Sequence, residues 1–168
     1  MKKYEFTGEV KRIKLIGTEV VLRRIRAVTA FGVVKAGDIG GWIEKEENLS
    51  HDGDAWVYGG AEVYGDARVY GDARVYGDAI VCGDAEVYSA NHILSIGPVG
   101  SRNEYTTFYR DKNEKIEVRC GCFNGIIEEF LEKVAETHGE NKHASVYRAA
   151  AEIAKLQIEP LSTDEEAE

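Results

Sequence analysis

Apolar residues recur every six positions from Ala55 to Tyr88, a spacing that fits neither an α-helix nor a plain alternating strand. Read from Val57, the stretch is VYGGAE, VYGDAR, VYGDAR, VYGDAI and VCGDAE. Within each hexad, alternation sends Ala and Val to one side of a short strand, and Gly permits a sharp corner. A short strand followed by a corner, repeated many times, predicts a coil.

These hexads resemble those of the hexapeptide-repeat proteins, whose chain winds as a left-handed parallel β-helix of triangular section with three hexads per turn. The resemblance implies that residues eighteen apart lie side by side, so that Val57 contacts Val75, Val63 contacts Val81 and Val69 contacts Val87. The outward positions are expected to stack in the same way. These are Trp56 with Arg74 and His92, Glu62 with Ile80, and Arg68 with Glu86.

Residues 36–54 keep the six-residue period only imperfectly. Ile43 and Leu49 fall on the small inward position that Ala fills later, whereas Lys45 and His51 fall on the position of the inward Val. The first coil is therefore expected to be irregular. The string GDIGGWIEKEENLSHDGDAWVYG resembles a segment of hexapeptide-repeat proteins from phages and prophages, many of which are labelled as transferases.

The N-terminal residues 1–35 alternate loosely, with turn residues at Gly8 and Gly17. They predict a β-hairpin or small sheet that caps the open end of the coil, because an uncapped end exposes unpaired backbone and apolar core. The arginines of this cap, Arg23, Arg24 and Arg26, are either its solvated face or part of an anion site.

After His92 the six-residue period disappears. Residues 105–110 and 115–122 read as the two strands of a hairpin with its turn at 111–114, and the apolar residues 93–99 can supply a third strand. In the second of these strands Ile116, Val118, Cys120 and Cys122 alternate onto one face, which predicts that both cysteines are core residues.

Two helices follow the hairpin. The first opens at Asn124-Gly125, repeats apolar residues at helical spacing and stops at Gly139, and the second runs from about Lys142 to Gln157. The predicted fold is mainly β. It comprises an N-terminal β cap (1–35), a left-handed parallel β-helix (36–92), a small α+β module of ββαα or βββαα order (93–158) and an acidic tail (159–168).

The charge of the 168-residue chain, −9 overall, is uneven. Residues 1–35 carry nine basic against three acidic side chains, whereas residues 36–92 carry three against twelve. The acidic total argues against general nucleic-acid binding. The sequence contains no apolar run as long as a membrane span and no apolar N-terminal signal segment, which favours the bacterial host cytosol and no membrane partner.

Acyl transfer with coenzyme A is one functional hypothesis, since many hexapeptide-repeat enzymes use a histidine as general base. The candidate bases are His51 and His92, but no loop interrupts the hexads to form a second wall. A metal site formed by Cys120 and Cys122 with Cys82, His92 or His138 is disfavoured, because Cys-x-Cys on a strand is a poor zinc spacing. We therefore assign no catalytic residue, no metal ligand and no cofactor.

A non-enzymatic binding site is the favoured hypothesis. Ser101-Arg102-Asn103 follows Gly97-Pro98-Val99-Gly100 and places a guanidinium and short polar side chains beside exposed backbone amides, which is either an anion cradle or a polar turn. Nearby tyrosines can supply stacking surface. The candidate ligand-binding residues are Ser101, Arg102, Asn103, Tyr105, Tyr109, Arg24 and Arg26.

The segment 96–139 also resembles a C-terminal module of phage-type proteins that is attached to more than one kind of repeat. This implies that the module carries recognition and that the repeats are a scaffold. The chain is then a phage or prophage binding protein in counter-defence, which sequesters a small phosphorylated ligand or occludes a host protein through its Asp corners and Tyr ridge. A structural or assembly role is the other alternative. Flat sides bearing Trp56, Ile80 and the tyrosines predict a homo-oligomer, with a trimer favoured.

Overall fold

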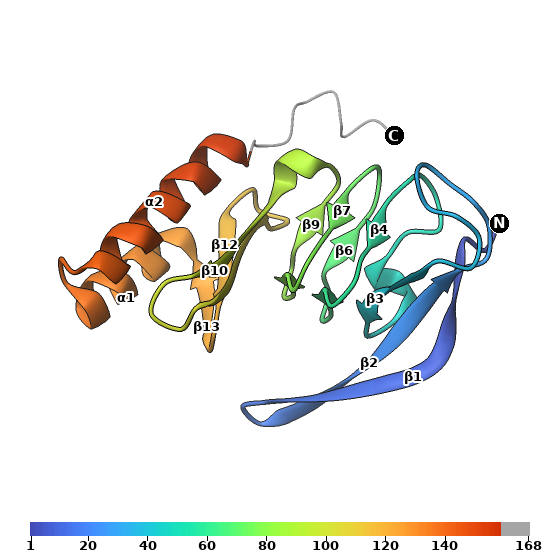
Figure 1. Ribbon diagram of the computed structural model, residues 1–168, viewed down its shortest axis with the longest axis horizontal. Coiled ribbons are helices and arrows are strands. Elements are labelled where there is room, and N and C mark those ends of the chain that lie inside the picture. The colour runs from blue at the N-terminus through green and yellow to red at the C-terminus, as the bar shows by residue number, and fades with distance from the viewer. Residues whose placement is uncertain (159–168) are drawn as a thin grey trace. The chain divides into compact units, whose positions relative to one another are not determined.

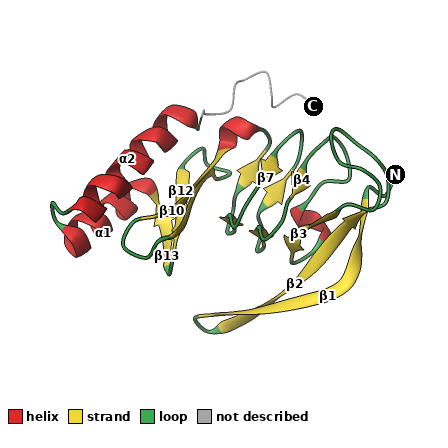
Figure 2. Ribbon diagram, viewed as in Figure 1, coloured by secondary structure: helices red, strands yellow, loops and turns green. Residues whose placement is uncertain are grey.

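The computed structural model describes residues 1–158, which are mainly β with two α-helices near the C-terminal end (Figure 1). The chain divides into two compact units, Met1–Ala90 and the residues from Asn91 on. Both α-helices belong to the second unit, and both units contain strands (Figure 2). The predicted acidic tail, residues 159–168, lies outside the described residues.

The first unit begins with a long antiparallel hairpin. Its strands are β1 (Tyr4–Leu15) and β2 (Thr18–Ala27), with Tyr4 opposite Ala27. Strand β2 continues the sheet to β3 (Ile39–Ile43). The β2 residues Val20 and Leu22 pack with Tyr64 and Cys82 from two successive turns of the coil. Strand β2 thus pairs with the free edge of β3, as the predicted cap requires, and the hairpin also packs on a side of the coil.

Six two-residue strands form the regular part of the coil, and β4, β6, β7 and β9 among them are labelled in Figure 1. Strand β4 pairs with β7, β5 with β8 and β6 with β9, each pair parallel and eighteen residues apart. This register confirms the predicted contacts Val57–Val75, Val63–Val81 and Val69–Val87, and all six valines are fully buried. Burial of each side chain stabilises the coil by about 1.5–3 kcal/mol. The strands are β4 (Trp56–Val57), β5 (Glu62–Val63), β6 (Arg68–Val69), β7 (Arg74–Val75), β8 (Ile80–Val81) and β9 (Glu86–Val87).

The first coil has a different spacing. Ile43 lies beside Val63 and Leu49 bridges Val69, so that the partners here are twenty residues apart. Ile43 and Leu49 thus occupy the inward position of the later valines, and their predicted placement on the Ala position is wrong. The two additional residues lie between Leu49 and Val57, at a wide corner formed by residues 50–54.

The wide corner is held by Lys3, the residue before β1. Lys3 is buried, and its Nζ donates to the carbonyl oxygens of Ala55 at 2.8 Å and Gly53 at 3.3 Å. The backbone N–H of Lys3 donates to His51 Nδ1 at 3.2 Å. His51 is therefore part of this corner and does not take the inward position of a valine.

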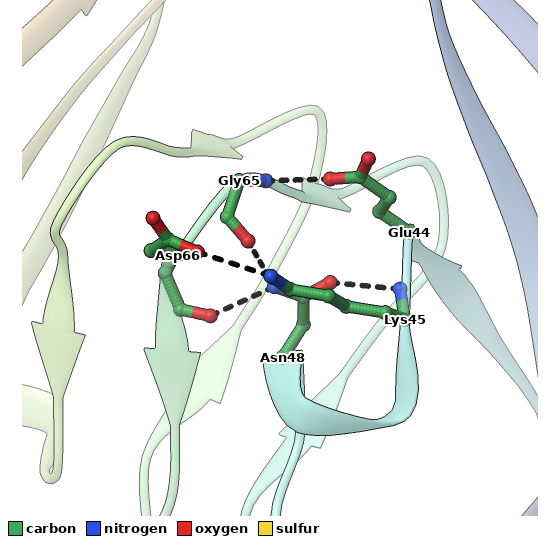
Figure 3. A network of polar contacts seen from close by, with 6 residues as sticks. Glu44, Lys45, Asn48, Gly65 and Asp66 are labelled. Atoms are coloured by element: carbon green, nitrogen blue, oxygen red, sulfur yellow. Dashed lines mark hydrogen bonds and ion pairs between the residues drawn. The ribbon is translucent and has the colours of Figure 1, made fainter.

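Polar contacts replace strand pairing where the short 3-10 helix η1 (Glu46–Asn48) meets the next turn (Figure 3). Asn48 Nδ2 donates to the carbonyl oxygens of Ala67 at 2.8 Å and Gly65 at 3.1 Å, while its Oδ1 accepts from the Lys45 N–H at 2.9 Å. Lys45 Nζ lies 3.0 Å from Asp66. Asn48 is fully buried, and these bonds satisfy its amide.

The outward face of the coil is less apolar than the sequence suggested. Trp56 is only 1% exposed, because Phe31 and Tyr4 pack against its ring edge to face at 5.4 and 6.2 Å. Ile80 is partly buried against the hairpin. Tyr76 remains 51% exposed and stacks on Tyr58 at 4.5 Å. The expectation that Trp56 lies on an open flat side is therefore wrong.

The second unit is a four-stranded antiparallel sheet with two helices. Its strands are adjacent in chain order, β10 (Ile93–Val99), β11 (Glu104–Arg110), β12 (Ile116–Cys120) and β13 (Phe123–Ile126). The hairpin of β11 and β12 forms as predicted. Strand β13 was missed, because its residues were assigned to the start of a helix.

Helix α1 (Ile127–His138) ends at Gly139, as predicted, and α2 (Lys142–Gln157) has the predicted bounds. Asn141 caps α2, its Oδ1 accepting from the Ala144 N–H at 3.0 Å. Both helices pack on one sheet face, where Phe108 and Val118 meet Phe130 and Tyr147. No helix within residues 1–158 is long and apolar enough to cross a membrane.

Candidate ligand pocket

A pocket of about 430 Å³ opens in the second unit beside α1 and the turns that precede β11 and β13. Its apolar lining comes from Phe123, Phe130, Val134 and Tyr147. Its polar lining includes Ser101 and Arg102 from the first turn and Lys133 and His138 from α1. The pocket thus combines an aromatic floor with basic side chains.

Arg102 lies across the turn between β12 and β13. A β-carbon at Gly121 would come 2.8 Å from Arg102 Nε and 2.9 Å from its Cδ, so a larger residue there would displace this side chain. Gly121 also has φ +57°, a left-handed conformation that favours glycine. The Arg102 side chain therefore lies over Gly121, where the backbone between Cys120 and Cys122 carries no side chain.

The Arg102 guanidinium is paired with Glu104, whose Oε2 accepts from Nε at 2.9 Å. This hydrogen bond and the charge of Glu104 raise the pKa of Arg102, so the side chain is always positive. The bond uses one of the five N–H donors of the guanidinium, and the other four are on its Nη atoms. Both side chains are more than half exposed, so water weakens the pair.

Tyr147 fixes the position of Ser101. The Ser101 backbone N–H donates to the Tyr147 hydroxyl at 3.2 Å, and Ser101 Oγ lies 3.4 Å from His138 Nε2. A β-carbon at Gly100 would come 2.1 Å from the Tyr147 ring, so only glycine fits there. The turn that carries Ser101 and Arg102 is thereby attached to α2.

Lys133 supplies a second positive charge to the pocket lining. Its Nζ lies 3.2 Å from Glu136, one turn further along α1, and both side chains are about two thirds exposed. An exposed pair at this spacing contributes little to stability. Lys133 and Arg102 are therefore both in contact with solvent at the pocket and both available to an anion.

The structure brings some of the predicted site residues together. Ser101 and Arg102 line the pocket; Asn103 lies in the same turn with φ +53°, and Tyr105 is half-buried. Tyr109 is fully buried, so its ring offers no exposed face for stacking.

Arg24 and Arg26 belong to the first unit, where their partners are structural. Arg24 Nη1 lies 3.6 Å from Glu9 Oε2, and its Nε donates to the Gly40 carbonyl. The Arg24 guanidinium also lies over the Trp42 ring at 5.3 Å. Arg26 pairs with Glu5 across β1 and β2. These contacts favour the solvated face of the hairpin over an anion site.

Sequence reasoning missed the contribution of α1 to the pocket. Phe130, Val134 and Thr137 follow one another at helical spacing, with Lys133 and His138 next to them. The helix itself was predicted, so its polar residues were a signal that could have been considered as partners of the Ser101 turn. What was lacking was the strand β13, which determines how α1 begins.

The two cysteines of this turn have different environments. Cys120 is half-buried, and its Sγ accepts a hydrogen bond from Thr106 Oγ1 at 3.3 Å. Cys122 is exposed in the turn, so its prediction as a core residue is wrong. Both thiols line the pocket. Within residues 1–158 no group of three or more His, Cys, Asp or Glu side chains is placed to hold a metal ion.

The histidines proposed for acyl transfer are poorly placed for a general base. His51 accepts the Lys3 N–H and stacks on Tyr4, and burial lowers its pKa. His92 is only 2% exposed. His138, by contrast, lines the pocket and lies within hydrogen-bond distance of Ser101.

Comparison with known proteins gives one short match. No model of a known protein family matches the chain. An alignment 62 residues long, which covers 34% of this chain, is 39% identical to the "Uncharacterized acetyltransferase YdcK" of Escherichia coli K12. That stretch covers 19% of the E. coli protein, so the chain spans about a fifth of its relative's length.

Proposed function

We propose that this chain is a non-enzymatic binding protein whose C-terminal module holds a small phosphorylated or otherwise anionic ligand. The observation that carries the proposal is the pocket itself, which Arg102 and Lys133 line together with Phe123 and Phe130. Its volume of about 430 Å³ is that of a small-molecule site. A nucleotide-like molecule fits this chemistry, because it joins an anion to a flat apolar ring.

The anion is assigned to the Arg102 end of the pocket. The Nη donors of Arg102 and the Ser101 hydroxyl can bind the oxygens of a phosphate, and charge-assisted bonds of this kind are stronger than neutral ones. Phe123 is partly buried and offers its ring to the apolar part of the ligand. Glu104 competes with the ligand for Arg102.

The experiment is a binding titration of the full chain with three probes, namely inorganic phosphate, adenosine monophosphate and uncharged adenosine. We expect the monophosphate to bind most tightly and Arg102→Ala to weaken its binding by about tenfold to a hundredfold. Arg12→Ala is the matched control, since Arg12 forms an exposed pair with Glu19 in the hairpin of the first unit. Equal affinity of Arg102→Ala and wild type, or no binding of any anion, would contradict the proposal.

The scaffold is proposed to be a left-handed parallel β-helix of the hexapeptide-repeat type. The eighteen-residue parallel register supports it, as this is the spacing of three hexads per turn. The phage or prophage setting, and counter-defence by ligand sequestration or by occlusion of a host protein, remain part of this proposal. Expression in bacteria challenged with phage, with and without Arg102→Ala, tests that role.

Acyl transfer is the second candidate, because the matched relative bears the name of an acetyltransferase. The positions of His51 and His92 argue against it, since neither is free to act as a base in an open pocket. Acetyl-coenzyme A offers a direct test. The transferase would be favoured, and our first proposal opposed, if Arg102→Ala still bound this cofactor and substitutions on the surface of the coil (residues 56–87) abolished its binding.

A further inference from the structure

We propose that Cys122 is a covalent modification site that exchanges with anionic disulfides of low molecular weight, of which oxidised glutathione is the chemical type. The site is the turn Cys120-Gly121-Cys122 with Arg102 across it. It lies in the pocket proposed above, but it does not require reversible binding of a phosphate there.

The thiol of Cys122 is accessible. Cys122 is exposed in the turn between β12 and β13, whereas Cys82 is 3% exposed and Cys120 is half-buried with Thr106 donating to its Sγ. Thiol exchange requires a direct approach of the disulfide to the attacking sulfur. Of the three cysteines, Cys122 alone combines an exposed side chain with a place on the pocket lining.

Two positively charged side chains, Arg102 and Lys133, line the pocket together with Cys122, each in an exposed pair with a glutamate. The Arg102 side chain lies against Gly121, directly between the two cysteines, and Lys133 lines the same pocket. The Arg102 side chain is thus adjacent to the segment that carries Cys122, where its charge acts on an approaching reagent. Such a field concentrates anionic reagents at the thiol and repels cationic ones.

The pocket also has room for the adduct. It measures about 430 Å³ and its aromatic floor begins at Phe123, the residue after Cys122. The carboxylates of a glutathione moiety can then pair with Arg102 and Lys133. A cationic disulfide of similar reactivity lacks these partners.

The reaction balances without a further oxidant. The Cys122 thiolate attacks one sulfur of the disulfide, a new S–S bond forms, and the old S–S bond breaks. The departing thiolate takes a proton from solvent. Excess free thiol reverses the step, so the modification is reversible.

The test compares oxidised glutathione, which is anionic, with cystamine, which is cationic, at equal concentrations and low salt. Intact-mass measurement follows the adduct and peptide mapping locates it. We expect one glutathione on Cys122, none on Cys122→Ser, and modification by glutathione faster than by cystamine.

Arg102→Ala should slow the glutathione reaction by about threefold to tenfold, leave the cystamine reaction unslowed, and reduce the effect of added salt. Arg12→Ala is the control and should match wild type. Circular dichroism establishes that each variant is folded. An adduct on Cys120 or Cys82, or an unchanged rate ratio in Arg102→Ala, would overturn the inference.

The outcome is separable from that of the proposed function. Phosphate or nucleotide binding by Cys122→Ser tests the reversible site, since the substitution keeps a small side chain. Loss of exchange with intact anion binding contradicts only the covalent site. Exchange at Cys122 without any anion binding contradicts only the proposed function.

Discussion

Tyr4 stacks on His51, with ring centroids 4.2 Å apart and 21° between the ring planes. The Tyr4 hydroxyl also donates to the Leu49 carbonyl at 2.8 Å, just before the wide corner. The first residues of β1 thus hold a corner almost fifty residues later in the chain. Burial next to Tyr4 favours the neutral form of His51 and lowers its pKa below the ordinary 6.5.

Stability is therefore expected to fall as the solution becomes acidic. Below pH 6.5 the unfolded chain binds a proton at His51 while the folded chain does so only at lower pH, so the unfolded state gains protons first. Denaturant unfolding between pH 8 and pH 5 measures this. His51→Phe keeps a flat ring on Tyr4 without titrating, and its profile should be flatter. Arg12→Ala, which removes no group that titrates between pH 5 and pH 8, serves as the control and should keep the wild-type slope.

Val69→Asp is expected to destabilise the protein by about 3–5 kcal/mol, since the carboxylate would be buried without a partner between Leu49 and Val87. Arg68→Ala, at the neighbouring outward position, should change stability by less than about 0.5 kcal/mol. Chemical denaturation of both variants gives the comparison. A Val69→Asp protein as stable as wild type would show that Val69 does not face the coil interior.

Gly100→Ala should be more harmful than Gly139→Ala. Both residues have positive φ, +75° and +57°, so both substitutions incur backbone strain. Only at Gly100 does the new β-carbon also meet the Tyr147 ring, which adds about 1–3 kcal/mol. Thermal unfolding of the two variants isolates the second contribution. Equal loss in both would mean that Tyr147 does not restrain the Ser101 turn.

Glu104→Gln is expected to strengthen binding of adenosine monophosphate, because the substitution removes the carboxylate that competes for Arg102. A gain of about twofold to fivefold is reasonable for an exposed pair. Glu136→Gln, the partner of Lys133, provides a parallel test on the other side of the pocket. Calorimetric titration in low salt measures both. Weaker binding by Glu104→Gln would indicate that Glu104 positions Arg102 for the ligand.

We expect a homo-oligomer, with a trimer favoured. The exposed apolar surface of the coil is smaller than the sequence suggested. Trp56 is buried and Ile80 is partly covered, but Tyr76, which stacks on Tyr58, is still an exposed aromatic residue of the coil. Tyr76→Glu should therefore dissociate the oligomer, while Arg12→Ala leaves it intact. Analytical ultracentrifugation at micromolar concentration reports both. A monomeric wild type would remove this prediction.

The sequence predicted the regular part of the coil because each hexad repeats the same small and large residues. It predicted α2 because Asn141 and the apolar positions mark the helix clearly. The wide corner was not predicted, because residues 50–54 contain the Gly and Asp of an ordinary corner. Nothing in this segment indicates that the corner is two residues longer than the others. Contacts distant in sequence, such as those of Lys3 and Tyr4, decide the register there.

In the pocket, Ser101 and Arg102 were identifiable as a concentrated polar turn. Lys133 and His138 could not be identified in this way. They line the same pocket from helix α1, and the predicted start of that helix included residues that form strand β13. Cys122 illustrates a related difficulty. Its alternation with Cys120 suggested a continuing strand, but Gly121 adopts a positive φ and ends that strand at Cys120.

The uniform register from Trp56 to Val87 makes the coil adjustable in length. Because each strand lies on the one eighteen residues away, removal or duplication of one complete block of eighteen leaves every inward valine and outward side chain on its own side. Each added block would lengthen the scaffold by about 4.8 Å, the spacing of neighbouring strands. A block of six or twelve would instead rotate all later residues onto another side.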